Sequence, residues 1–189
     1  MVKKLLLLMV VSTASSMAAI VAYKVTLNGP NEPTASLGTG SGTVIFDTIL
    51  NTMAININFT GLTGTTSNAH IHCCTSSPFT GTAGVATTTP SFVGFPLGVT
   101  SGTFINTLNL LDPGSYNPAF ITAQGNIANA EAVLIAGAAS GSEYLNIHTS
   151  AFPGGEIRGF LTFTPEPGTF GMMGGALAAA AFFRRKFRG

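Results

Sequence analysis

The sequence predicts a mainly β protein. We expect an antiparallel, β-sandwich-like single domain with one short helix, plus an N-terminal signal peptide and a C-terminal transmembrane sorting helix. Two observations predict the fold. Apolar and polar residues alternate in several short stretches, which is the period of a half-buried strand. Glycine and proline recur between these stretches, as they do in the turns of sandwiches and barrels.

The N-terminus has the three parts of a secretory signal peptide. Lys3 and Lys4 supply the positive charge, residues 5–11 the apolar core, and Ser16-Met17-Ala18 a small-x-small cleavage site. We therefore divide the chain into a signal peptide over residues 1–18, a folded domain over 19–164 and a sorting segment over 165–189.

The expected strands cover residues 23–28, 42–46, 53–59, 68–73, 99–110, 143–149 and 156–163. The clearest is 53–59, where Met53, Ile55, Ile57 and Phe59 alternate with small or polar residues. One helix is expected over 127–138, with Asn126 as its N-cap and Gly137 or Gly141 as its end. Residues 75–98 are rich in glycine, threonine and proline, so we expect a functional loop or a loop with short edge strands.

The folded domain carries little charge. Residues 19–164 hold two basic and six acidic residues, a net charge of −4. Binding of nucleic acid is not expected, because it depends on Lys and Arg that contact phosphates. The polar surface must consist of Thr, Ser, Asn and Gly, which suits a neutral polymer such as extracellular polysaccharide as well as water.

The three histidines of the chain are His70, His72 and His148. His70 and His72 project from the same face of one expected strand, and His148 lies on another. Neutral imidazoles from neighbouring strands commonly bind a transition metal, and three of them leave a coordination position open. One Cu or Zn ion is therefore a candidate cofactor. The alternative is a protein without a cofactor, in which each ring is structural and bonded to backbone carbonyls.

The two cysteines, Cys73 and Cys74, are adjacent. In an oxidising compartment they could form a vicinal disulfide, remain as one buried and one exposed thiol, or pair between molecules. Neighbouring side chains on a strand point to opposite faces, which disfavours the vicinal bond.

Glu156 and Arg158 lie two residues apart on the last expected strand and so share a face. Arg158 is the only arginine of the folded domain, and we expect it to be paired. The candidates are an ion pair with Glu156 or Glu143, hydrogen bonds to loop carbonyls, or recognition of a ligand. The chain has no nucleophile elbow, phosphate loop or dinucleotide-binding motif. No catalytic residue is assigned, and we expect the protein not to be an enzyme unless its activity is metal-dependent.

Three blocks resemble, in order, the signature of the CHRD (chordin-type) domain: NAHIHC at 68–73, YLNIHT at 144–149 and PGGEIRG at 153–159. The resemblance covers about residues 23–163. It implies a β-sandwich-like extracellular module, found in animal chordin and in many bacterial secreted proteins, and no established reaction. We take Thr149, Glu156 and Arg158 as its structural motif. The doubled cysteine departs from the usual pattern.

The first of these blocks also resembles, loosely, the copper-binding strand of Cu/Zn superoxide dismutase. That enzyme uses more ligands, so a two-metal dismutase site cannot be assembled from three histidines. A mononuclear site remains open.

The last 25 residues begin with Pro165-Glu166-Pro167, continue with 16 uncharged residues and end in a basic cluster that includes Arg184 and Arg185. A transmembrane helix needs about 17–25 residues, so the uncharged run is slightly short. The basic cluster that follows it is expected to stay in the cytoplasm. This order of parts resembles the PEP-CTERM sorting signal of Gram-negative bacteria. The resemblance implies cleavage near Pro165-Glu166-Pro167 by an exosortase-type membrane protease. The alternative is an ordinary tail anchor.

These observations predict an exported, non-catalytic CHRD-domain protein. We expect its tail to anchor it briefly in the inner membrane before it is sorted to the cell envelope or the exopolysaccharide matrix of a biofilm, as a structural or adhesion component. The alternative function is a mononuclear Cu/Zn-binding metalloprotein that uses the three histidines.

Overall fold

The computed structural model describes residues 20–165, which contain eight strands, two α-helices and a 3-10 helix at Pro113–Ser115. In chain order the elements are β1 Ile20–Asn28, β2 Thr39–Asp47, β3 Thr52–Thr60, β4 Thr66–His72, β5 Gly102–Asn109, α1 Pro118–Gln124, α2 Ile127–Ser140, β6 Tyr144–Thr149, β7 Ile157–Phe160 and β8 Thr162–Phe163. The predicted signal peptide and sorting helix lie outside the described residues. Within residues 20–165, neither helix has the length and apolar character that a bilayer span requires.

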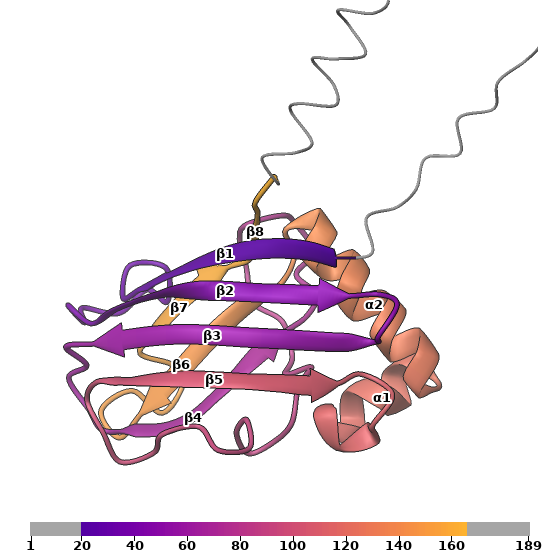
Figure 1. The fold of residues 1–189 in the computed structure, drawn as a ribbon. Coiled ribbons are helices and arrows are strands. Elements are labelled where there is room, and N and C mark those ends of the chain that lie inside the picture. The colour runs from indigo at the N-terminus through magenta and orange to yellow at the C-terminus, as the bar shows by residue number, and fades with distance from the viewer. Residues whose placement is uncertain (1–19, 166–189) are drawn as a thin grey trace, which may run out of the picture.

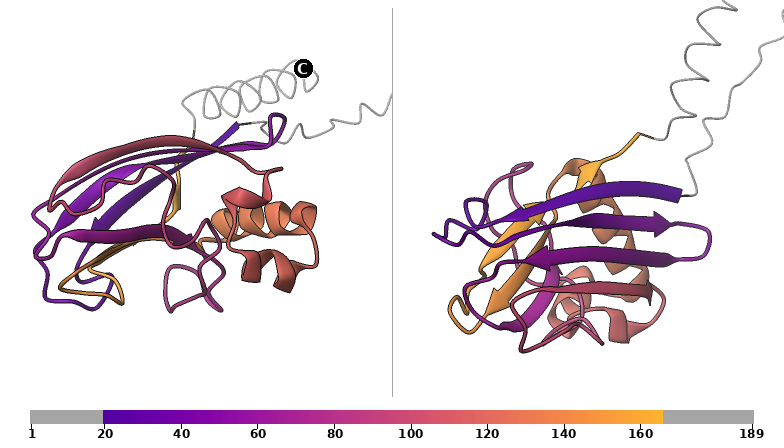
Figure 2. Two further views of the ribbon diagram at one scale, coloured as in Figure 1. Left: turned by 90° about the horizontal axis from the view of Figure 1, so that it is seen from below. Right: turned by 60° about the vertical axis from the view of Figure 1, so that its left-hand side comes forward.

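The strands form one antiparallel sheet in the order β4-β6-β7-β1-β2-β3-β5, and β8 pairs with β1. The sheet curls, so that β1, β2, β3 and β5 lie side by side in one layer while β4, β6 and β7 run behind them (Figure 1). Figure 2 shows the two layers from below, with both helices at one end. The predicted mainly β, sandwich-like architecture is confirmed, and its two layers belong to a single curled sheet.

The core lies between the two layers. Met53, Ile55, Ile57 and Phe59 of β3 are all buried, as their alternation predicts. The layer behind contributes the apolar residues of β4, β6 and β7 that face the same interior: Ala69, Ile71, Leu145, Ile147 and Ile157. These five side chains occupy alternate positions of their strands, so the intervening side chains of β4, β6 and β7 lie on the face away from the core.

The two helices begin and end at residues that suit those places. The Asn126 side chain accepts the N–H of Asn129 at the start of α2, and Gly141, with φ of 71°, ends it. Helix α1 was not predicted from the sequence. It begins where the Asn117 side chain accepts the N–H of Ala119, and it ends at Gly125.

The long segment after β4 is irregular and covers the open edge of that strand. Phe92 N–H donates to Ala69 O, Ala86 N–H to Ile71 O and Gly98 N–H to Thr66 O. The ring of Phe92 also stacks on Phe104 of β5, with centroids 5.4 Å apart. An exposed strand edge can pair with the strands of other chains, and this segment covers the edge of β4 that would otherwise be free. It also places its own carbonyl groups close to β4.

Candidate functional site

Strand pairing brings the three histidines together. β4 and β6 are antiparallel neighbours in which His70 lies opposite Asn146, His72 opposite Tyr144, and His148 opposite Asn68. Opposite residues share a face, as do alternate residues along a strand. All three imidazoles therefore lie on the face of β4 and β6 that points away from the core.

The rings form a compact, buried cluster. Their centroids are 4.9 Å apart for His70 and His148, 5.5 Å for His70 and His72, and 6.1 Å for His72 and His148. One ring nitrogen from each residue lies within 4.8 Å of the other two. The residues are only 4–8% exposed, because the loops around β4 and β6 cover them.

Each ring is fixed by a loop carbonyl. His70 Nε2 lies 2.8 Å from Pro90 O, His72 Nδ1 lies 2.9 Å from Ala83 O, and His148 Nδ1 lies 2.9 Å from Pro153 O. A carbonyl oxygen can only accept a hydrogen bond, so each of these nitrogens carries the proton and donates. The long segment after β4 supplies two of the carbonyls, and the turn before β7 supplies the third.

The second nitrogen of each ring has no partner among the described residues. These atoms are His70 Nδ1, His72 Nε2 and His148 Nε2, and all three are buried. Because the opposite nitrogen carries the proton, each of them presents a lone pair. The cluster thus holds three buried acceptors that nothing in the described part of the chain satisfies.

Burial keeps these imidazoles neutral. Loss of solvation lowers the pKa of His70 to about 4, against the opposing effect of the Pro90 carbonyl. The pKa values of His72 and His148 are also lowered, chiefly by burial. Neutral imidazoles with one nitrogen anchored and the other free are the form in which histidine binds transition metals, and a carbonyl on the N–H is the usual outer partner of such a ligand.

Glu156 and Thr149 form a second buried group that holds loops together. Glu156 Oε1 accepts from Ser36 Oγ and Thr63 N–H at 2.5 Å each, and Oε2 accepts from Thr149 Oγ1 at 2.6 Å and Gly64 N–H at 3.1 Å. Burial by itself would raise the pKa of Glu156, but these four hydrogen bonds together lower it below its ordinary value. This carboxylate ties the loops after β1 and β3 to the end of β6.

Arg158 pairs with a residue that the sequence analysis did not consider. Its Nε lies 3.1 Å from Glu32 Oε2, while the N–H itself is directed to Asn31 O. Its guanidinium carbon is 4.8 Å from the centre of the Tyr144 ring, and Nη1 donates to Gly81 O at 3.2 Å. Arg158 therefore binds loop carbonyls and Glu32, which lies in the loop after β1. The expected ion pairs with Glu156 and Glu143 are not found among the described residues.

Two further residues belong to this face and were missed. Asn146 lies between His70 and Arg158 in the sheet register, and its place two residues before His148 was a sequence signal for this position. Glu32 had no such signal, because its contact with Arg158 joins distant parts of the chain. Of the sorting residues, Pro165 follows β8 and is exposed, whereas Glu166, Pro167, Arg184 and Arg185 lie outside the described residues.

The cysteines form a vicinal disulfide. The expectation against this bond assumed that both lie on a strand, but β4 ends at His72. The alternation of side chains therefore does not apply to them.

Comparison with known proteins identifies two segments. Residues 163–186 match the PEP-CTERM protein-sorting motif, which marks a chain for export through the membrane to the cell envelope and is generally a substrate of exosortase. The chain has no match among curated proteins or solved structures. Residues 23–161, nearly all of the described fold, match the CHRD domain. The chain therefore belongs to the CHRD domain family.

Proposed function

We propose that this exported protein binds one copper or zinc ion through His70, His72 and His148. The observation that carries the proposal is the set of three buried ring nitrogens without partners, beside three that are anchored. A purely structural role explains the anchored nitrogens only. Each buried acceptor left without a partner costs about 1–3 kcal/mol, and an ion shared by all three would satisfy them at once.

The donor set suits these ions. Imidazole is a common ligand of zinc and copper, and three neutral rings leave at least one position for water or another ligand. Zn–N bonds of about 2.0–2.1 Å in a tetrahedral site place the nitrogens about 3.3 Å apart. One nitrogen of each ring now lies within 4.8 Å of the other two, so binding would draw the coordinating nitrogens closer together. The function would be metal scavenging in the envelope or redox chemistry at a bound copper.

Metal loading tests this proposal. The exported chain is stripped with a chelator, loaded with copper or zinc and analysed for bound metal. We expect about one equivalent and a higher melting temperature, because a ligand that binds only the folded state stabilises it. His148→Ala should weaken binding sharply, whereas Asn56→Ala, an exposed change on β3, should not. Less than about 0.1 equivalent with an unchanged melting temperature would exclude the site.

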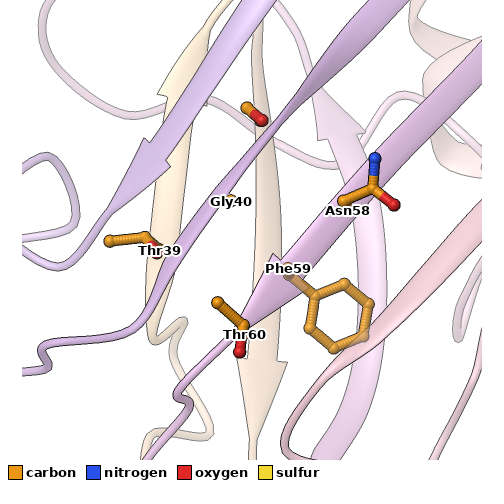
Figure 3. Close-up of a pocket in the computed structure, with 6 residues that line it drawn as sticks. Thr39, Gly40, Asn58, Phe59 and Thr60 are labelled. Atoms are coloured by element: carbon orange, nitrogen blue, oxygen red, sulfur yellow. The ribbon is translucent and has the colours of Figure 1, made fainter.

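A second candidate is a non-catalytic structural or adhesion component of the extracellular matrix. The outward face of β2 and β3 supports it, because a hollow of about 310 Å³ on that face has no charged residue in its lining. Figure 3 shows this hollow, with its lining drawn as sticks. The lining residues are Thr39, Gly40, Ser41, Asn58, Phe59 and Thr60. Hydroxyl and amide groups of this kind can exchange hydrogen bonds with a neutral polysaccharide.

Electrophoresis in gels that contain a neutral glucan tests the adhesion role. The exported protein should be retarded, and Asn58→Ala should reduce the retardation while Thr82→Ala, an exposed loop change, should not. Equal mobility with and without glucan would count against this candidate.

We also propose how the protein reaches its place in a Gram-negative cell. An exosortase-type protease would cut near Pro165-Glu166-Pro167 after the tail enters the inner membrane, and the domain would then pass to the envelope or matrix. Mass spectrometry of the exported protein should find a C-terminus near residue 165 that is lost when the exosortase gene is deleted. A tail that stays uncut in both strains would instead indicate an ordinary anchor.

A further inference from the structure

A second cluster of reactive groups lies at the end of β4, beside the helices. The Cys73–Cys74 disulfide lines a cleft of about 460 Å³ together with residues of α1, α2 and the segment after β4. Cys74 is exposed and Cys73 is 6% exposed. One sulfur is therefore open to molecules in the cleft, and the other faces the interior.

Glu143 lies on the interior side of this disulfide. It is fully buried, and both of its carboxylate oxygens lack a hydrogen-bond partner within residues 20–165. One of its oxygens lies within 4.8 Å of both sulfurs. Burial raises the pKa of Glu143 well above its ordinary value, which favours the protonated carboxyl group.

Gly137 of α2 makes the close approach possible. A Cβ at this position would lie 2.7 Å from Cys73 Sγ, 2.8 Å from Cys74 Sγ and 2.9 Å from Glu143 Oε1. Glycine inside a helix is destabilising by itself. Its presence here lets the helix pack directly over the two sulfurs and the carboxyl group.

We propose that Cys73 and Cys74 form a redox site that exchanges with small thiol compounds, and that Glu143 supplies and recovers the proton of this exchange. The site is separate from the histidine cluster, because Cys73 belongs to the core side of the sheet whereas the histidines lie on the other face.

The exchange proceeds in two balanced steps. The thiolate of a small thiol attacks Cys74 Sγ and forms a mixed disulfide. The Cys73–Cys74 bond breaks, its electron pair goes to Cys73 Sγ, and Cys73 takes the proton of Glu143. Glu143 then regains a proton from solvent, which replaces the one that the attacking thiol released. A second thiol molecule cleaves the mixed disulfide, so that two thiols are oxidised to their disulfide and both cysteines end as thiols.

A structural role explains this cluster poorly. Disulfides stabilise a fold by closing loops, and the effect grows with loop length, whereas adjacent residues close no loop of the chain. A buried carboxyl group without partners is also destabilising. The cleft is lined by small and apolar side chains such as Val85, Ala123 and Val133, which suits a small thiol compound.

The rate of disulfide reduction tests the proposal. The full chain, expressed with both termini and purified after export, is treated with dithiothreitol at neutral pH, and the gain of two hydrogen atoms is followed by mass spectrometry. Glu143→Gln keeps the shape of the side chain and removes its acidic proton. We expect it to slow reduction more than about tenfold, as loss of a general acid does. Glu131→Gln, a matched change in α2, should stay within about twofold.

Equal rates for wild type and Glu143→Gln would overturn the proposal. If Glu143→Gln does not fold, the rate of disulfide reduction in the wild-type protein still tests the proposal. Its native disulfide should be reduced at least as fast as that of the urea-unfolded chain. Slower reduction in the native state would show a protected, structural bond.

Discussion

The buried carboxylate of Glu156 offers a sharp test of how the fold is held together. In Glu156→Gln the side chain keeps its shape but loses its charge and one acceptor oxygen. Each wild-type oxygen accepts one hydroxyl and one backbone N–H. The new NH2 group, which can only donate, must therefore face one hydroxyl and the backbone N–H of either Thr63 or Gly64. The hydroxyl can rotate away, but the backbone N–H cannot.

The expected loss follows from these contacts. A hydrogen bond to a charged group contributes about 1.5–3 kcal/mol, and a neutral one about 1 kcal/mol, so the two bonds that remain lose at least about 1 kcal/mol together. The backbone N–H left without an acceptor costs about 1–3 kcal/mol more. The free energy of unfolding should therefore fall by at least about 2 kcal/mol in total.

Urea unfolding at neutral pH measures this loss. The midpoint should fall without a change in the slope m. Asp112→Asn removes the same charge from an exposed turn, and its effect should stay below about 1 kcal/mol. A loss below about 0.5 kcal/mol in Glu156→Gln would refute the account of this carboxylate. Because its folded pKa is lowered, its contribution should be present above pH 4.5, the ordinary value, and should disappear as the pH falls through the folded pKa.

Three further perturbations follow from the structure. Gly137→Ala should lower the free energy of unfolding by about 1–3 kcal/mol in urea, because the new Cβ overlaps two sulfurs and a carboxyl oxygen; a gain, as expected for Gly→Ala in an open helix, would contradict this packing. Arg158→Lys keeps the charge but loses the bond to Gly81 O and the contact with Tyr144, and calorimetry should show a loss of about 2 kcal/mol. Between pH 6.5 and 4 the metal-free His70→Gln protein should gain stability relative to the wild type, because the unfolded wild-type chain binds a proton that folded His70, with its pKa lowered to about 4, does not bind, while the other titrating groups are common to both proteins; a constant difference over this range would show that His70 titrates normally.

The sequence predicted the local features well. The alternation of β3 predicted a strand with one buried face, and the N-cap at Asn126 predicted the start of α2. The signals of α1 were also present, since Asn117 precedes a proline, but its seven residues are too short for a helical period to stand out. Features that depend on residues close together in the chain, such as strand alternation and helix caps, could therefore be predicted from the sequence.

Long-range pairing could not be predicted in this way. His70 and His148 meet because β4 pairs with β6, and no local pattern specifies that neighbour. Glu32 reaches Arg158 from the loop after β1, so the expected acidic partners Glu156 and Glu143 were wrong, whereas the expected alternative of hydrogen bonds to loop carbonyls is found. Carbonyl contacts and metal binding are also not alternatives in this protein, because each ring uses one nitrogen for a carbonyl and leaves the other without a partner among the described residues.

The central claim is that the three histidines together hold one metal ion. X-ray absorption at the zinc or copper edge of the loaded, exported protein measures the ligands directly. The account predicts three imidazole nitrogens at about 2.0–2.1 Å and no sulfur. A shell of sulfur at about 2.3 Å would place the ion at the cysteines, and fewer than three imidazoles would contradict the histidine site.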